Sequence, residues 1–476
     1  MDWEQLWKSE LNGVNMIPDD ERTATPRDLF WLWFGANIGI LGILYGAIIV
    51  GFQLSFLQSI LAAAIGSLSF VLVGVLSVSG RDGGEPMFVL SKRIFGYRGN
   101  WGPGVVNWIN LLGWESVMVI TGSLTLQALI SIIFRVPTSL VIGIISVAVF
   151  AGLVVSFSLF GYTTLVFIQK VASWAFGALT LLVIVLLLHH ATWTGAILVS
   201  PGHWVTGFFP AVSIIVAGTG ISWAPAAADY SRYVSHRTKT GRLIWAVTSG
   251  GAIPLFVLMF TGILITDHIA NLAASSNPIM TIGNTLPGWM EPLYLVTVIG
   301  GLIAEANLSL YSSGLNLMGI GIRLPRKKTI WIDAVITIAV TVFVIFVRKN
   351  FFSPFESFLT LMGVSLAAWS GVFLGGGFRQ RFARGFLQRT EVQRPIHWCA
   401  VASWAISVVT GLLLTTTSIY TGPLAKGVFA TSNLGIIVAF FVGISLQSGG
   451  ERWLGGHTKY TSINEPRNEN MDVIDK

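Results

Sequence analysis

The chain has 476 residues, of which 53% are hydrophobic and 11% are charged, and its mean hydropathy is +0.72. Soluble domains carry about 25% charged residues, so this composition excludes an ordinary soluble protein. The net charge of +7 reflects 29 Lys and Arg residues against 22 Asp and Glu residues.

Apolar runs of roughly 20 residues follow one another along the chain, and each is long enough to cross a hydrocarbon core of about 30 Å. Residues 1–27 are polar and lack the apolar core of a signal peptide. From residue 448 the chain is polar again, which predicts a disordered cytoplasmic tail at 448–476. Between these ends we predict twelve membrane-spanning helices, near residues 28–51, 55–79, 104–133, 138–160, 166–190, 205–228, 243–266, 289–319, 330–347, 355–377, 397–418 and 430–447.

The basic residues orient these helices in the membrane. If the N-terminus is cytoplasmic, 25 of the 29 Lys and Arg residues fall in segments on that side. Cytoplasmic segments carry such an excess, so we predict a multi-pass protein of the plasma membrane with both termini in the cytoplasm. Basic loops beside anionic lipid also explain the net charge, and we expect no nucleic acid partner.

Two predicted spans contain helix-breaking residues at matching positions. The first carries "GANIGILG" at 35–42, and the sixth carries "GTGISWAP" at 218–225. Five crossings separate these spans, so they run in opposite directions through the membrane. Interrupted helices in two oppositely oriented halves are typical of inverted-repeat transporters. The alternative interpretation is that these glycines only allow helices to pack closely.

Polar residues inside the spans are candidates for a site. Asn107, Asn110, Trp114 and Thr121 share one face of the third predicted helix. Because an Asn-rich face is costly against lipid, we expect it to point into the bundle. Glu115 and Glu305 are carboxylates well inside apolar spans, where ionisable groups are usually functional. The alternative for each is a protonated carboxyl group that only hydrogen-bonds within the bundle.

Four motifs resemble one known family. "IPDDER" (17–22), "FGYRGN" (95–100), "WAPAAADYSRY" (223–233) and "LYSSGLNLMGIGI" (310–322) are similar to motifs of the nucleobase:cation symporter family, purine–cytosine permease branch. The resemblance runs from about residue 10 to 450, in the same order and spacing. It implies uptake of a nucleobase with H⁺ or Na⁺ rather than an enzymatic reaction.

The resemblance also implies a leucine-transporter-type fold, an all-α integral membrane architecture with two inverted five-helix repeats. Residues 28–190 would form the first repeat and 205–377 the second. Two accessory helices would follow at 397–447.

Site residues follow from the same resemblance. Trp114 matches the family's stacking Trp, and Asn307 matches the Asn whose amide contacts the edge of the base. The family usually has Gln or Asn one turn after that Trp, whereas this chain has Met118. On the sixth helix, we expect an unwound stretch at Thr219, Gly220 and Ser222 to offer backbone groups to the base. The corresponding residues on the first helix are Asn37 and Gly39.

Three further residues are given roles. Asp229 and Arg232 belong to the strongest family motif and are three residues apart, so we interpret them as a gating or structural ion pair at the cytoplasmic end of the sixth helix. Sodium-coupled relatives use two hydroxyl residues, six and five positions before the substrate Asn. Here these positions are Gly301 and Leu302. Glu305 lies on the same helix face, so we predict H⁺ coupling through Glu305, with Na⁺ binding by Glu305 as the rival.

Other classes of function remain as alternatives. An ion channel would need a filter or repeated pore charges, and a receptor would need a signalling domain; the sequence has neither. Within transporters, a hydantoin- or allantoin-like ureide is the second substrate class. The single cysteine, Cys399, excludes a Cys-based metal site, and we expect no metal or cofactor beyond the coupling ion. The sequence leaves the particular base and the oligomeric state open.

Overall fold

The computed structural model describes residues 12–189, 191, 202–266, 269, 272, 275, 277–348, 352–382 and 394–454. In these ranges the chain is helical, and its only β-type pairings are two isolated bridges, Ala24 with Val234 and Thr416 with Thr421. The predicted tail at 448–476 lies outside the described residues after Leu454. Most of the N-terminal segment, residues 1–11, also lies outside them.

Most helices of the first half of the chain lie in the predicted spans; η1 and α6 lie outside them. They are η1 (Asp19–Glu21), α2 (Pro26–Asn37), α3 (Leu41–Gly51), α4 (Phe56–Leu68), α5 (Phe70–Gly83), α6 (Met87–Phe95), α7 (Trp101–Phe134), α8 (Leu140–Ser158), α9 (Tyr162–Val171), the π-helical η2 (Ala172–Phe176) and α10 (Gly177–Leu188).

The second half continues in the same way. Its helices are the π-helical η3 (Trp204–Phe208), α12 (Phe209–Val216), the π-helical η4 (Ala217–Ile221), η5 (Ala224–Ala226), α13 (Ala227–Ser231), α14 (Thr240–Ile265), α15 (Pro278–Gly283), α16 (Glu291–Gly319), α17 (Arg326–Phe343), the π-helical η7 (Val344–Arg348), α18 (Phe352–Phe382), α19 (Trp398–Leu413), η8 (Gly427–Phe429) and α20 (Gly435–Leu454).

Hydropathy and length support fewer full spans than the twelve predicted. Nine helical stretches among the described residues are long and apolar enough to cross a membrane, and a bent pair, α2 with α3, makes a tenth. The last two predicted spans coincide with shorter apolar helices, Trp398–Leu413 and Gly435–Gly450. The protein is therefore a multi-pass helical membrane protein with about ten clear spans. The repeat arrangement and the domain boundaries remain predictions.

The first predicted helix is broken, as its sequence indicates. α2 ends at Asn37, α3 begins at Leu41, and the two axes differ by 60°. The sixth predicted helix differs from the prediction. It remains helical through η4, so the prediction of an unwound stretch at Thr219, Gly220 and Ser222 is wrong. The local glycines serve packing there, since a Cβ at Gly220 would lie 2.4 Å from the backbone of Ser69.

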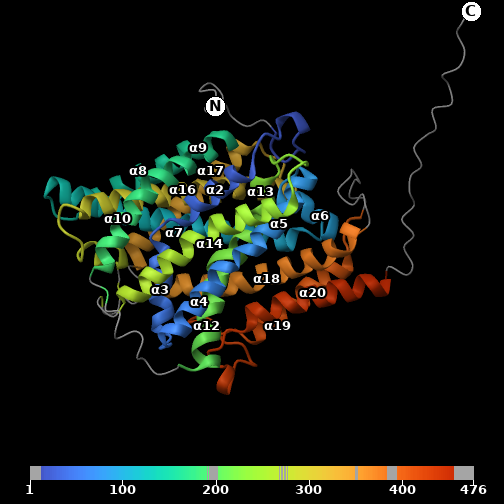
Figure 1. Ribbon diagram of the computed structural model, residues 1–476. Coiled ribbons are helices and arrows are strands. Elements are labelled where there is room, and N and C mark those ends of the chain that lie inside the picture. The colour runs from blue at the N-terminus through green and yellow to red at the C-terminus, as the bar shows by residue number, and fades with distance from the viewer. Residues whose placement is uncertain are drawn as a thin grey trace, which may run out of the picture.

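The helices pack as two groups with α18–α20 along one side (Figure 1). In the first group α14 packs against α2, α3, α4 and α5. In the second group α16 packs against α7, α8 and α17. The break between α2 and α3 therefore lies within the first group, facing the second.

The last two long helices contact each other directly. On α19, Sγ of Cys399 lies 3.8 Å from Oε1 of Gln447 on α20.

The segment before α2 crosses one end of the bundle. The Ile17 amide donates to the Gly84 carbonyl at 2.9 Å, and the buried Arg22 donates to the Arg81 carbonyl at 3.0 Å. These contacts fix residues 12–25 against the end of α5.

Candidate functional site

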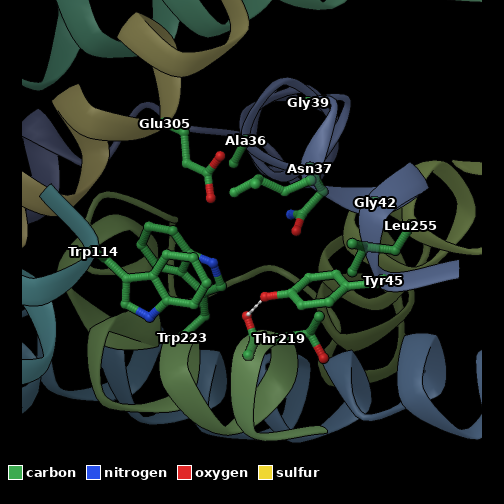
Figure 2. Close-up of a pocket in the computed structure, with 12 residues that line it drawn as sticks. Ala36, Asn37, Gly39, Gly42, Tyr45, Trp114, Thr219, Trp223, Leu255 and Glu305 are labelled. Atoms are coloured by element: carbon green, nitrogen blue, oxygen red, sulfur yellow. Dashed lines mark hydrogen bonds between the residues drawn. The ribbon is translucent and has the colours of Figure 1, made fainter. Parts of the chain in front are cut away.

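A small cavity lies where the two helix groups meet. The α2–α3 break contributes much of its lining, together with η4 and the residue Trp223 from the first group (Figure 2). The second group contributes Trp114 from α7 and Glu305 from α16. The full lining is Ala36, Asn37, Gly39, Leu41, Gly42, Tyr45, Trp114, Gly218, Thr219, Trp223, Leu255 and Glu305.

The helix break supplies two of the predicted site residues. Asn37 is the last residue of α2, and its Nδ2 donates to the Trp33 carbonyl one turn earlier at 2.8 Å. Gly39 lies inside the break, where an added Cβ would be 3.7 Å from Oε2 of Glu305. The Glu305 carboxyl group therefore lies within van der Waals reach of the break.

Aromatic side chains give the cavity flat walls. Trp114 is 4% exposed, and its indole Nε1 donates to Oγ of Ser222 at 3.2 Å. Trp223 packs edge-on against Trp33, with 5.5 Å between ring centroids. Flat apolar walls of this kind can stack against a planar ligand.

Sequence reasoning did not identify Trp223 and Tyr45 as site residues. Trp223 lies inside the "WAPAAADYSRY" motif, so the motif itself was an available signal. Tyr45 lies within the apolar stretch of α3, where nothing in the sequence distinguishes it from a core aromatic.

Glu305 is the carboxylate of the cavity. Its side chain is 8% exposed and points toward the space between Asn37 and Trp223 (Figure 2). Within the described part of the chain it makes no hydrogen bond or ion pair. A buried carboxylate without compensation is costly, so this position is suited to a proton, a cation or a donor group of a ligand.

The polar side chains in η4 and directly after it make hydrogen bonds within the protein. Oγ1 of Thr219 donates to the Ile215 carbonyl at 2.6 Å and lies 3.1 Å from Oγ of Ser69. Ser222 follows η4 and donates to the Ala217 carbonyl at 2.5 Å. Thr219 lines the cavity, whereas Gly220 and Ser222 do not. Ser222 instead orients Trp114.

Asn307 and Glu115 lie away from the cavity lining. Asn307 is 1% exposed, and its Nδ2 has no hydrogen-bond partner among the described residues. Oε2 of Glu115 accepts a hydrogen bond from Thr337 on α17 at 3.3 Å. One turn away on α17, Asp333 accepts from Trp108 at 2.9 Å. Glu115 therefore belongs to a polar cluster between α7 and α17, and its predicted role is still a prediction.

The Asn-rich face of α7 points into the bundle. Asn107 donates to Oδ1 of Asn316 at 3.2 Å, and Asn110 donates to the Ser222 carbonyl at 3.4 Å. Both side chains are buried. They join α7 to α16 and to the end of η4, which positions Trp114 one turn further along.

Asp229 and Arg232 lie at the end of the bundle that carries the N-terminal segment. Asp229 accepts from the Met87 amide at 2.8 Å. Arg232 is fully buried and donates to the Gly13 carbonyl at 2.6 Å and to the Tyr311 hydroxyl at 3.1 Å. Both residues therefore connect different segments, and their role as a gating or structural ion pair stays a prediction. Among the described residues, no cluster of three or more His, Cys, Asp or Glu side chains could hold a metal ion.

Comparisons with known proteins point to one family. A family model described as "Permease for cytosine/purines, uracil, thiamine, allantoin" matches residues 16–443. The chain is 26% identical over 456 residues to the Bacillus subtilis protein named "Putative purine-cytosine permease YxlA", covering 93% of this chain and 94% of that one. It is also 26% identical over 263 residues to the purine-cytosine permease FCY2 of Saccharomyces cerevisiae, covering 53% of this chain and 47% of the yeast chain.

Solved structures show the fold. Mhp1, a nucleobase-cation-symport-1 family transporter in a closed conformation with bromovinylhydantoin bound, superimposes with a TM-score of 0.75 at 19% identity. That match covers 94% of this chain and 96% of Mhp1. The inward-facing conformation of Mhp1 has the same identity and coverage, with a TM-score of 0.69. The chain therefore has the fold of Mhp1.

Proposed function

The chain belongs to the family of permeases for cytosine/purines, uracil, thiamine and allantoin, and on this premise we propose that it imports a nucleobase by symport with a cation. Members of this family are permeases, not enzymes. The observation that carries the proposal is the cavity between the two helix groups, where Trp114 and Trp223 provide flat walls and Asn37 and Glu305 provide polar groups. Ligand sites of transporters commonly lie at such helix breaks near the middle of the bilayer.

The proposed substrate is a base of the cytosine or purine class. Such a ring is apolar on its faces and has amide-like donors and acceptors along its edge, which suits an aromatic pocket with few polar groups. A hydantoin- or allantoin-like ureide shares the edge but presents a smaller ring face. The walls formed by Trp114 and Trp223 therefore favour the nucleobase.

We propose H⁺ rather than Na⁺ as the coupling ion. Gly301 and Glu305 lie one turn apart on α16, and both face the helix break. A Cβ on Gly301 would lie 3.7 Å from the Cα of Gly39, and a Cβ on Gly39 would lie 3.7 Å from Oε2 of Glu305. Na⁺ prefers several hard oxygen ligands. At this position the chain offers a glycine and one carboxyl group, which favours a proton held by Glu305.

The proposed orientation has both termini in the cytoplasm of a plasma-membrane protein. It rests on the bias of Lys and Arg residues toward one side of the membrane. The end of the bundle with Arg22, Arg81 and Arg232 is then the cytoplasmic end, and Asp229 and Arg232 are placed to act on the closure of that side.

The test is uptake of radiolabelled cytosine, adenine, guanine, hypoxanthine, uracil and allantoin into cells that lack their own permeases. We expect saturable, concentrative uptake of a cytosine- or purine-class base in sodium-free buffer, stimulated by an inward proton gradient. Uptake of allantoin and of no base would show that the substrate is a ureide and not a nucleobase. Uptake that requires Na⁺ and ignores the proton gradient would refute H⁺ coupling, and a current without substrate accumulation would favour a channel.

A further inference from the structure

The cavity is poor in available hydrogen-bond donors. Five lining side chains could donate. The indole N–H of Trp223 is one of them, and the other four already donate to another protein group: Asn37 to the Trp33 carbonyl, Tyr45 to the Gly218 carbonyl, Thr219 to the Ile215 carbonyl and Trp114 to Ser222. These bonds are 2.8, 3.3, 2.6 and 3.2 Å long, respectively. The donors left for a bound ring are therefore few: the second N–H of Asn37 and the indole N–H of Trp223.

Glu305 is the carboxyl group of the lining, and in its protonated form it can present a donor and an acceptor together. Its carboxyl group points into the cavity from α16, opposite Asn37 and beside the indole of Trp223 (Figure 2). No described residue hydrogen-bonds to it. A ring stacked on either Trp would present its edge to this carboxyl group.

The chemistry of the ring edge decides which form of Glu305 fits. A neutral base presents a donor next to an acceptor, either as a cyclic amide (N–H beside C=O) or as an amidine (NH₂ beside a ring nitrogen). A protonated carboxyl group also presents one donor and one acceptor, whereas an ionised carboxylate presents acceptors only. The protonated form can make two parallel hydrogen bonds to either edge. The ionised form would place an oxygen against the ring's own acceptor.

We infer that Glu305 binds the substrate edge and the coupling proton together, so that a neutral cyclic amide or amidine base binds only with one proton. This inference rests on the proposed function and adds a substrate ligand and a mechanism of coupling to it. The proton enters from one side, is held between Glu305 and the base, and leaves with the base on the other side. Neither the base nor Glu305 changes covalently, and one proton moves with each base.

Other ionisable groups near α16 face elsewhere. Asp28 on α2 pairs with Lys170 on α9, with 2.6 Å between Oδ1 and Nζ. Glu115 on α7 contacts Thr337, and Asp333 on α17 contacts Trp108.

Tyr45 on α3 is the ionisable side chain that shares the cavity lining with Glu305 among the described residues. Its hydroxyl is committed to Gly218. Within this part of the chain, the proton linked to base binding therefore belongs to Glu305.

The test uses the full chain purified in detergent, with radiolabelled cytosine as the amidine probe and radiolabelled hypoxanthine as the cyclic amide probe. Binding affinity is measured across a pH series in sodium-free buffer. Above the pH at which Glu305 ionises in the free protein, we expect affinity to fall about tenfold per pH unit, because one proton is linked to binding. At a pH well above that point, calorimetry in two buffers of different ionisation enthalpy should give one proton taken up per base bound.

Two variants separate the roles of Glu305. Glu305→Gln keeps one donor and one acceptor but cannot ionise, so it should bind a probe with an affinity that no longer depends on pH. Glu305→Leu should lose at least tenfold in affinity at low pH while retaining the size-exclusion elution volume and the thermal unfolding of the wild type. Asp333→Asn is the matched control and should keep the pH slope of the wild type.

The outcomes are distinguishable. Wild-type binding that does not change with pH, or a Glu305→Gln variant with an unchanged pH slope, would overturn the shared site yet leave nucleobase transport intact. Failure of every base in the uptake panel would overturn the proposed function as well. If Glu305→Leu misfolds, the Glu305→Gln pH profile still decides the question.

Discussion

Trp114 and Ser222 join the two helix groups at the wall of the cavity. The indole Nε1 of Trp114 on α7 donates to Oγ of Ser222, directly after η4, at 3.2 Å. Ser222 in turn donates to the Ala217 carbonyl, so the π-helical segment fixes the in-plane orientation of the indole. The wall formed by Trp114 therefore comes from the second helix group, whereas Ser222, which orients it, comes from the first.

Trp114→Ala should remove high-affinity uptake while leaving the protein in the membrane, because it removes a stacking face and not a span. Stacking of a base on an aromatic side chain contributes about 1–3 kcal/mol, so apparent affinity should fall about 5- to 150-fold. Uptake kinetics normalised to the amount of protein in the membrane measure this. Trp101→Ala is the control on the same helix, since Trp101 is 55% exposed.

Trp114→Phe should retain part of the activity, because the ring face remains while the hydrogen bond to Ser222 is lost. Unchanged apparent affinity in Trp114→Ala would show that Trp114 is not the stacking platform.

Asn307→Ala tests whether this amide acts on the substrate in another conformation of the cycle. Nδ2 of Asn307 is buried without a hydrogen-bond partner among the described residues, which normally costs about 1–3 kcal/mol. If the base provides that partner during transport, Asn307→Ala should raise the apparent KM about 5- to 150-fold. A wild-type KM in this variant would show that Asn307 does not bind the substrate. A higher Tm in the same variant would then show that the unpaired amide only destabilises the folded protein.

Gly46→Ala should destabilise the protein. A Cβ at Gly46 would lie 2.2 Å from the Met259 carbonyl oxygen and 2.8 Å from the Cα of Gly262, so α3 and α14 would have to separate. Overpacking of this kind costs about 1–3 kcal/mol, and thermal unfolding in detergent should show a lower Tm. Gly51→Ala, on the same helix but with nothing within 4 Å of the added Cβ, should unfold like the wild type. Equal Tm values for both variants would contradict the close packing.

Arg232→Lys should impair the protein more than a conservative change usually does. The planar guanidinium of Arg232 reaches both the Gly13 carbonyl and two tyrosine hydroxyls, Tyr233 and Tyr311, and an ammonium group cannot reproduce that geometry. We expect a lower Tm and a lower maximal uptake rate with little change in KM, because Arg232 does not line the cavity. Arg237→Lys, at an exposed position, is the control. A rise in KM alone would assign Arg232 to substrate binding.

The fold was largely predictable because hydropathy and the bias of basic residues act over whole segments. The break in the first helix was also predictable, since Gly35, Asn37 and Gly39 concentrate helix-breaking residues in a few positions. The form of the sixth helix was not. Glycine spacing is the same for an unwound segment and for a π-helix packed on Ser69, and only the neighbouring helix distinguishes them.

The lining of the cavity was harder to predict than the helices. Helical periodicity separates Glu305 from Asn307 on α16, but it does not say which of the two faces the break; that depends on how α16 packs against α2 and α7. Tyr45 was missed because an aromatic residue in an apolar helix has no distinguishing pattern. Glu115 stands next to Trp114 in the sequence, yet a step of one residue turns its side chain toward Thr337 and α17.

Cys399 makes the molecule well suited to spectroscopy. It is the single cysteine of the chain, and its sulfur contacts Gln447 at the junction of α19 and α20, remote in sequence from every cavity residue. Cys399→Ser would preserve a polar contact with Gln447 and remove the single thiol of the chain. Cysteines introduced on α2 and α17 could then carry paired spin labels, and the distances between them would report how the two helix groups separate when the base and the proton are released.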